Sequence, residues 1–185
     1  MHGELNRPTW RLMLGVLLLW LSGVGVAQAA QICQKGVAQQ AVDPRWQRLD
    51  AQTVRDQQTG LVWQTCGWGL SGQACQQDQV QRLTWPQAKE LVYRLNKQAW
   101  GGASNWRLPT VAELTGLVRP GCLRPSIDLR AFPNTPTLWF WSDGGTAEEG
   151  ADRAYLDFTT GWPGEDDPQL ANAVRLVRED KPAAP

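Results

Sequence analysis

Residues 101–118, GGASNWRLPTVAELTGLV, contain the corner that decides the fold. Pro109 biases the residue before it toward extended backbone. Thr110 is followed three positions later by Glu113, which is the spacing of a capping box, where both side chains accept hydrogen bonds from backbone N–H groups at a helix start. The segment therefore predicts a short strand that turns abruptly into a helix, and its role is architectural.

The helix after Thr110 has an apolar stripe and an expected end. Val111, Leu114, Leu117 and Val118 recur at helical spacing. Proline followed by glycine at 120–121 is expected to stop this helix.

A longer helix is predicted upstream by the same signals. Thr84 and Gln87 repeat the capping-box spacing, and Pro86 lies in the first turn, where its missing N–H is tolerated. Apolar residues then recur on one face to Leu95. We expect this helix to run to about Asn96.

Strand signals flank both helices. Thr53–Asp56 and Leu61–Gln64 enclose a turn that ends in Gly60, which predicts a hairpin. Three more strands are predicted after the helices, at 137–142, 154–158 and 173–177, separated by loops rich in turn residues. This order of elements predicts an α+β domain with an antiparallel sheet.

The first 29 residues have the features of a secretory signal peptide. Arg7 and Arg11 precede the apolar run 12–26, and Ala27 and Ala29 follow it. We expect cleavage after Ala29, no membrane span in the processed chain, and a periplasmic or secreted location. The remaining chain is divided into an irregular segment at 30–52, a domain at 53–178 and a flexible tail at 179–185.

Export favours disulfides for the four cysteines. Three pairings are possible. We favour Cys66 with Cys75, because the glycines between them allow a tight loop, which leaves Cys33 with Cys122. The spacings do not match paired zinc knuckles, so we expect no metal site and no cofactor.

Composition excludes several function classes. The only histidine is His2, in the leader, so histidine-activated nucleophiles and the usual zinc hydrolase sites are unavailable. We expect no enzyme activity. The formal net charge is zero, which gives no reason to expect nucleic acid as a partner.

Tryptophans are the first candidates for ligand binding, although most of the 11 in the chain must lie in the leader or in the core. Trp139 and Trp141 share one face of a predicted strand, with Phe140 opposite. If they face solvent they suit stacking on a sugar ring, and otherwise they belong to the core. Trp162 is the stronger candidate, because its loop is rich in glycine and proline and loops carry function on rigid scaffolds. The favoured interpretation of its ring is nevertheless a plug that folds back onto the protein.

Charged residues provide the other candidates. Arg119, Arg124 and Arg130 are offset locally only by Asp128, and arginine forks suit sulfate. A solvated surface is the alternative interpretation. Acidic residues in two loops have no calcium-loop spacing, so solvated charge is favoured for them; they are Glu148, Glu149, Asp152, Glu165, Asp166 and Asp167.

Six motifs occur in the order typical of one family: TGLVWQ, TWPQA, GGASNWRLPTVAEL, PSIDLRAFPNTP, FWS and VRLVR. Over about residues 53–178 the chain resembles the Lcl C-terminal domain family, whose domain forms the C-terminal end of a bacterial collagen-like adhesin. The resemblance implies a disulfide-stabilised C-type lectin-like fold with antiparallel strands and two main helices. For the adhesin member it implies binding of sulfated glycosaminoglycans.

The sequence departs from this family in ways that bear on the ligand. No collagen repeat precedes the domain, and Tyr93 stands where many relatives place a cysteine. The sugar-binding tripeptides Glu-Pro-Asn and Gln-Pro-Asp are absent, and only the segment ending at Asp143, Trp-Ser-Asp, is similar to a lectin's Trp-Asn-Asp strand. The fold therefore transfers better than the ligand.

We thus expect an exported, noncatalytic recognition domain of adhesin type that binds a glycan, sulfated or not, or a protein at the cell envelope. The candidate binding residues are Trp162, Trp139, Trp141, Asp143, Arg124 and Arg130. Two alternatives are an accessory component of an envelope or pilus assembly, and an enzyme similar to formylglycine-generating enzymes, which requires a reactive thiol.

Overall fold

The computed structural model describes residues 30–37, 43–144 and 154–180. The expected signal peptide, the last part of the expected tail and three of the acidic candidates, Glu148, Glu149 and Asp152, lie outside these ranges. Within them, no helix is long and apolar enough to cross a membrane.

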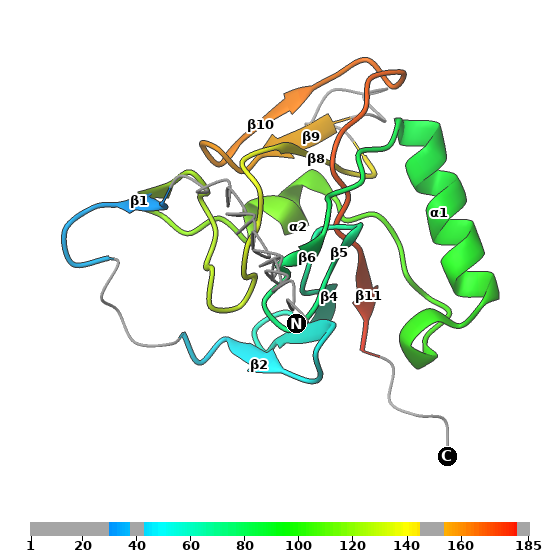
Figure 1. Cartoon of the computed structure of the whole chain (residues 1–185), viewed down its shortest axis with the longest axis horizontal. Coiled ribbons are helices and arrows are strands. Elements are labelled where there is room, and N and C mark those ends of the chain that lie inside the picture. Colours follow the sequence, from blue (N-terminus) through cyan, green and yellow to red (C-terminus); the bar gives the residue numbers. More distant parts are fainter. Residues whose placement is uncertain (1–29, 38–42, 145–153, 181–185) are drawn as a thin grey trace, which may run out of the picture.

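A four-stranded antiparallel sheet forms one end of the molecule (Figure 1). Its order is β11 (Val177–Glu179), β4 (Leu61–Gln64), β3 (Thr53–Asp56) and β2 (Trp46–Arg48). The predicted hairpin is confirmed as β3 and β4. The expectation of irregular structure before residue 53 is wrong at β2, which extends the sheet because it pairs with β3 and packs the Trp46 ring edge-on against Phe132.

A three-stranded antiparallel sheet forms the other end. Its order is β10 (Trp162–Glu165), β9 (Ala154–Asp157) and β8 (Trp139–Trp141). β10 lies in a segment expected to be a loop, because Pro163 and a glycine are typical of turns. The strand exists because β9 supplies a pairing edge along its whole length.

The last predicted strand is displaced along the chain. Residues 173–177 were expected to form it, but β11 begins at Val177. Ala173 instead bridges Phe140 of β8, so this segment passes from the three-stranded sheet to the four-stranded one.

Both predicted helices form, and both capping boxes are confirmed. α1 (Trp85–Lys97) has the expected length. α2 (Val111–Thr115) is shorter than expected, because Val118 leaves the helix and pairs with Ile127. A short 3-10 helix, η1 (Trp100–Gly102), follows α1.

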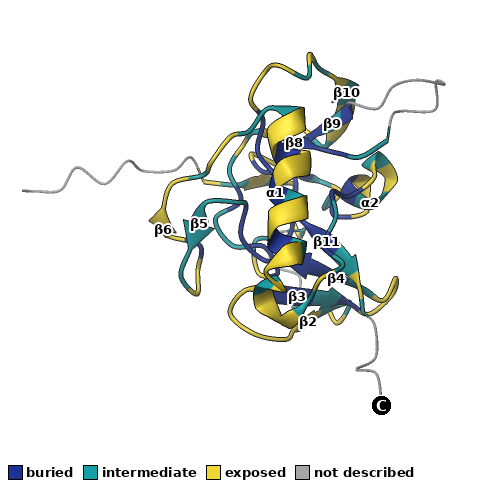
Figure 2. Cartoon of the chain, turned by 90° about the vertical axis from the view of Figure 1, so that its right-hand side faces the viewer, coloured by how far each residue is buried: buried dark blue, intermediate teal, exposed yellow. Residues whose placement is uncertain are grey.

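Helix α1 packs its apolar face across both sheets (Figure 2). Its buried residues Ala88, Leu91 and Leu95 share a cluster with Val62 of β4 and Trp141 of β8. The outer side of the helix is exposed. α1 therefore covers only part of the three-stranded sheet.

Two disulfides hold the remaining short strands, and both favoured pairings are confirmed. β1 (Ile32–Cys33) pairs with β7 (Cys122–Leu123), and Cys33 is bonded to Cys122 across that pair. β5 (Leu70–Ser71) lies within the loop closed by Cys66 and Cys75 and pairs with β6 (Gln77–Asp78), which follows directly after that loop. The fold class is thus the expected mixed α+β type, with antiparallel sheets, one long and one short helix, and two disulfides.

A buried cation joins the sheets to the irregular segment between β7 and β8. Arg175 is fully buried and donates to the carbonyls of Gln64 and Thr65 and to the hydroxyl of Thr135. Its guanidinium lies 4.7 Å from the ring centre of Phe132. Burial lowers the pKa of Arg175 to about 9, so the group is still charged at neutral pH.

Candidate functional site

The corner at residues 106–113 is architectural, as its sequence predicts. Arg107 binds both carboxylate oxygens of Glu113 and also reaches Glu179 of β11. Burial acts to raise the pKa of Glu113, but hydrogen bonds from Arg107 and Thr110 outweigh it and hold that pKa below its ordinary value. The corner thus ties α2 to the edge of the four-stranded sheet.

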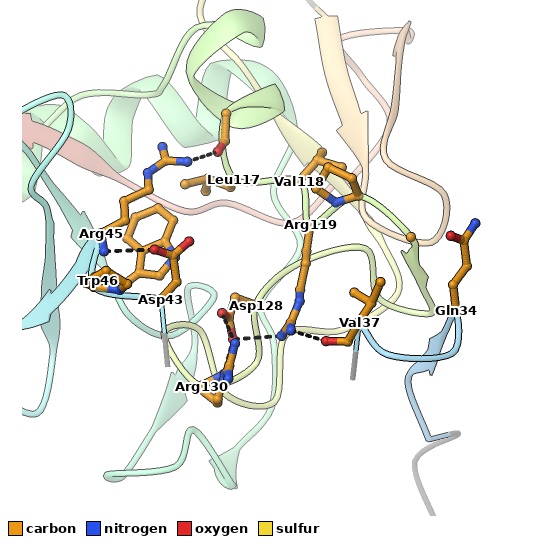
Figure 3. A pocket seen from close by; sticks show the side chains of 14 residues that line it. Gln34, Val37, Asp43, Arg45, Trp46, Leu117, Val118, Arg119, Asp128 and Arg130 are labelled. Carbon is orange, nitrogen blue, oxygen red and sulfur yellow. Dashed lines mark hydrogen bonds and ion pairs between the residues drawn. The ribbon is translucent and has the colours of Figure 1, made fainter. Parts of the chain in front are cut away.

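A cavity with a volume of about 680 Å³ lies between β2, the residues after α2, and the segment that leads to β8 (Figure 3). We call it the arginine-lined cavity, because Arg45, Arg119 and Arg130 line it. Its size falls within the range of small-molecule sites. Whether it is free to bind an anion depends on the partners of these arginines.

Arg45 is held within the protein. It forms a two-point ion pair with the buried carboxylate of Asp56, at 2.8 and 2.6 Å, and donates to the carbonyl of Gly116. Its guanidinium also lies 4.4 Å from the ring centre of Trp46. Burial acts to raise the pKa of Asp56, but hydrogen bonds from Arg45, Thr59 and Gln58 hold it below its ordinary value.

Arg119 and Arg130 share the carboxylate of Asp128. Arg130 binds both of its oxygens, at 3.0 and 2.8 Å, and Arg119 lies 3.5 Å away while donating to the carbonyl of Val37. The hydrogen bonds from Arg130 outweigh burial and lower the pKa of Asp128. All three arginines of the cavity therefore have carboxylate partners in the fold.

A second region is the outward side of the three-stranded sheet. Asp157 of β9 lies directly opposite Trp162 of β10 and opposite Trp139 of β8. Opposed residues of antiparallel strands project to the same face, so the three form one row. We call this row, together with Tyr155, the aromatic face.

Both tryptophans of the row are open to solvent. Trp162 is 74% exposed and Trp139 is 41% exposed. The expectation that the Trp162 ring folds back as a plug is therefore wrong. Since neighbouring strands are about 4.8 Å apart, the two positions are separated by about 10 Å across Asp157.

The ring of Tyr155 packs against the ring of Trp139. The two rings are stacked, with centres 4.3 Å apart and planes 4° apart. The phenol also crosses β10, because a Cβ atom on Gly164 would lie 2.5 Å from the tyrosine oxygen. Burial is the main cause that raises the pKa of Tyr155, with smaller contributions from Asp166 and Asp157.

Asp157 fixes the turn at the end of the row. Its carboxylate accepts hydrogen bonds from the backbone N–H of Thr159, at 2.7 Å, and from the hydroxyl of Thr160, at 3.0 Å. The carbonyl of Asp157 accepts a bond from Gly161. The tryptophan at the start of β10 is therefore displayed on an ordered turn.

A hollow borders each tryptophan of the aromatic face. Trp139 lines one of about 440 Å³ together with Arg82 and Leu170. Trp162 lines another of about 570 Å³ beside β1 and β7, where Ile32 and Leu123 are also exposed.

The comparison with family models identifies this architecture. A model described as the Lcl C-terminal domain matches residues 52–178. The chain belongs to the Lcl C-terminal domain family. No curated protein and no solved structure matches the chain.

Within the Lcl C-terminal domain, the predicted binding residues do not form one site. Trp139 and Trp162 lie on the aromatic face, whereas Arg130 lies in the arginine-lined cavity. Arg124 is exposed and does not line the arginine-lined cavity, and its backbone N–H donates to the carbonyl of Thr159. Asp143 forms an ion pair with Lys89 of α1 at 2.7 Å.

Trp141 lies in the core of the Lcl domain. It is 0% exposed, and its indole N–H donates to the carbonyl of Leu83 at 2.7 Å. The condition for Trp139 and Trp141 to stack together on a sugar, exposure of both rings, is not met in this structure. The residues that lead into α1 cover one end of the strand and leave the other open.

The sequence did not single out Tyr155, Asp157 or Arg45. Their roles depend on pairing between strands that are distant in the chain, and a period-two pattern around Tyr155 is the only local signal. Among the described residues, no three histidine, cysteine, aspartate or glutamate side chains come together as a possible metal site.

Proposed function

We propose that this Lcl C-terminal domain is an exported recognition module that binds a glycan chain on its aromatic face. The observation that carries this proposal is the row Trp162, Asp157 and Trp139, with both indoles exposed on one side of an ordered sheet. Aromatic side chains are large apolar groups that form part of the interface when a ligand covers them.

The spacing of the two rings favours a chain over a single sugar. About 10 Å separates the two positions, which is longer than one sugar ring. A ligand that contacts both tryptophans must therefore have several units. The carboxylate between them is tied to its own turn, so it also disfavours a negatively charged group at that point.

Noncatalytic recognition at the cell envelope is supported by the cysteines. Both disulfides require an oxidising compartment to persist, and all four cysteines of the chain are paired. A mechanism like that of formylglycine-generating enzymes needs a reactive thiol, and the paired cysteines supply none.

The test is a glycan array probed with the oxidised, processed protein, followed by titration of the oligosaccharides that are retained. We expect the double variant Trp139→Ala/Trp162→Ala to lower the affinity at least tenfold. Tyr93→Ala is the matched control, because Tyr93 is an aromatic residue that is 61% exposed on α1, away from the sheet.

Equal binding by the double variant and the parent would refute the assignment to the aromatic face. Failure of the parent to retain any glycan would refute glycan recognition itself. In that case a protein ligand, or a structural role in an envelope assembly, becomes the better hypothesis.

A further inference from the structure

We propose that a second, smaller cavity of this domain binds one neutral sugar unit. The cavity has a volume of about 160 Å³ and lies between Trp100 and the loop closed by the disulfide of Cys66 and Cys75. It shares no lining residue with the aromatic face or with the arginine-lined cavity.

The cavity is lined by neutral residues only. Charged residues make up 19% of the chain, yet none of the residues around this cavity is charged. Its polar side-chain groups are three glutamine amides, from Gln52, Gln64 and Gln73, and the hydroxyl of Ser71, which is bonded to Asp78. A charged ligand would be desolvated here without a partner of opposite sign, so the cavity selects against ions.

The glutamine amides are available to a ligand. No hydrogen bond of the side chains of Gln52 or Gln73 is formed with any described residue. The carbonyl oxygen of the Gln64 side chain accepts a bond from Leu176 at 3.3 Å, which leaves its NH₂ group without a partner in the described part of the chain. An amide can donate and accept at one position, and a sugar hydroxyl requires the same combination.

Trp100 adds an apolar wall of fixed orientation. Its ring packs edge-on against Trp106 at 5.2 Å and against Trp68 at 6.2 Å. Its indole N–H has no acceptor among the described residues. An aromatic wall opposite several amides matches a sugar ring, which has C–H groups on its face and hydroxyls around its edge.

The size and rigidity of the cavity define the ligand further. About 160 Å³ is below the range of drug-sized sites, so only a single small ring fits. Gln64 belongs to β4, and its backbone N–H donates to the carbonyl of Leu176. The disulfide holds the opposite wall, so the backbone around the site is fixed before a ligand binds.

The experiment is an NMR titration of the oxidised, ¹⁵N-labelled protein with glucose, galactose, mannose and N-acetylglucosamine, followed on tryptophan indole N–H signals. We expect one of these sugars at millimolar concentration to shift the Trp100 signal in a saturable way, while glucuronate does not. Gln52→Ala/Gln73→Ala should weaken this binding about tenfold, and Ala51→Trp should block it by filling the cavity.

Gln76→Ala/Gln169→Ala is the matched control, since it removes two exposed amides outside the cavity. The absence of a saturable shift with all four sugars would overturn the proposal, as would an unchanged shift in Ala51→Trp. Trp139→Ala/Trp162→Ala should leave the Trp100 shift intact. Loss of oligosaccharide binding on the aromatic face and loss of this single-sugar site are therefore separate outcomes.

Discussion

The arginine-lined cavity and the aromatic face differ in where their strongest interacting groups find partners. In the cavity, Arg45 forms an ion pair with Asp56, and Arg119 and Arg130 both form ion pairs with Asp128 of the same chain. On the aromatic face, Trp139 and Trp162 leave much of their surface in water. The ion pairs of the cavity therefore stabilise the fold. The exposed tryptophan rings of the aromatic face remain able to contact a ligand.

The largest effect, a loss of stability, should come from breaking the ion pair between Arg45 and Asp56. Asp56→Ala leaves Arg45 without its carboxylate and removes the acceptor for Thr59 and Gln58. Loss of one partner of a buried pair costs about 3–5 kcal/mol. We expect the free energy of unfolding to fall by about 3 kcal/mol, measured by urea denaturation with both disulfides intact. A loss below about 1 kcal/mol would mean that this ion pair does not make a major contribution to the stability of the fold.

A smaller effect on stability, with a gain of binding, is expected for Asp128→Asn. The change removes the charge shared by Arg119 and Arg130 and should cost about 1–3 kcal/mol. The freed guanidiniums should then bind a sulfated oligosaccharide more tightly than the parent does, measured by calorimetry at low salt. No gain in affinity would show that the carboxylate does not limit anion binding.

The same variant should alter the pH dependence of stability in a defined direction. The pKa of Asp128 lies below the ordinary value of 3.8 in the folded protein. The stabilisation from its ionised form is therefore complete at neutral pH and is lost as the pH falls through the folded pKa. The difference in unfolding free energy between parent and Asp128→Asn should shrink only below about pH 4. A difference that shrinks already near pH 6 would contradict this assignment.

Gly164→Ala should perturb the aromatic face without removing a ring. The new methyl group would lie 2.5 Å from the hydroxyl oxygen of Tyr155, so the phenol must move away from β10 and from its stack with Trp139. A stacked pair contributes about 0.5–1.5 kcal/mol. We expect affinity for the oligosaccharide to fall by up to about tenfold, and near-ultraviolet circular dichroism to report the altered stack. Unchanged affinity would mean that the support from Tyr155 is dispensable.

The smallest effect should be that of Trp162→Ala on stability. An exposed side chain away from the core usually changes the unfolding free energy by less than about 0.5 kcal/mol. Urea denaturation of this variant, compared with Asp56→Ala, separates a residue kept for binding from one kept for folding. A loss above about 1.5 kcal/mol would place Trp162 in the fold and weaken the comparison.

Local signals predicted the parts of the fold that depend on neighbours in sequence. The capping boxes at Thr84 and Thr110 fix helix starts within three residues, and the turn ending at Gly60 fixes a hairpin. The end of α2 was harder to predict, because Val118 is drawn out of the helix by Ile127. That competition is tertiary and leaves no local pattern.

The candidate site was only partly predictable for the same reason. Trp139 and Trp141 have equivalent positions in the strand pattern, yet one is exposed and the other is fully buried. The difference arises where Leu83 and α1 cover the sheet. Likewise, Arg130 suggested an anion site, while Asp128, two residues away, occupies its guanidinium through two hydrogen bonds.

Pro163 gives the aromatic face one further property. It lies in β10, at the outer edge of its sheet, and it has no N–H to offer to an approaching strand. A sheet edge that lacks such a donor is a poor template for stacking one molecule on the next. Pro163 therefore lowers the tendency of this open edge to pair with the same edge of a second molecule, although exposed indoles lie beside it.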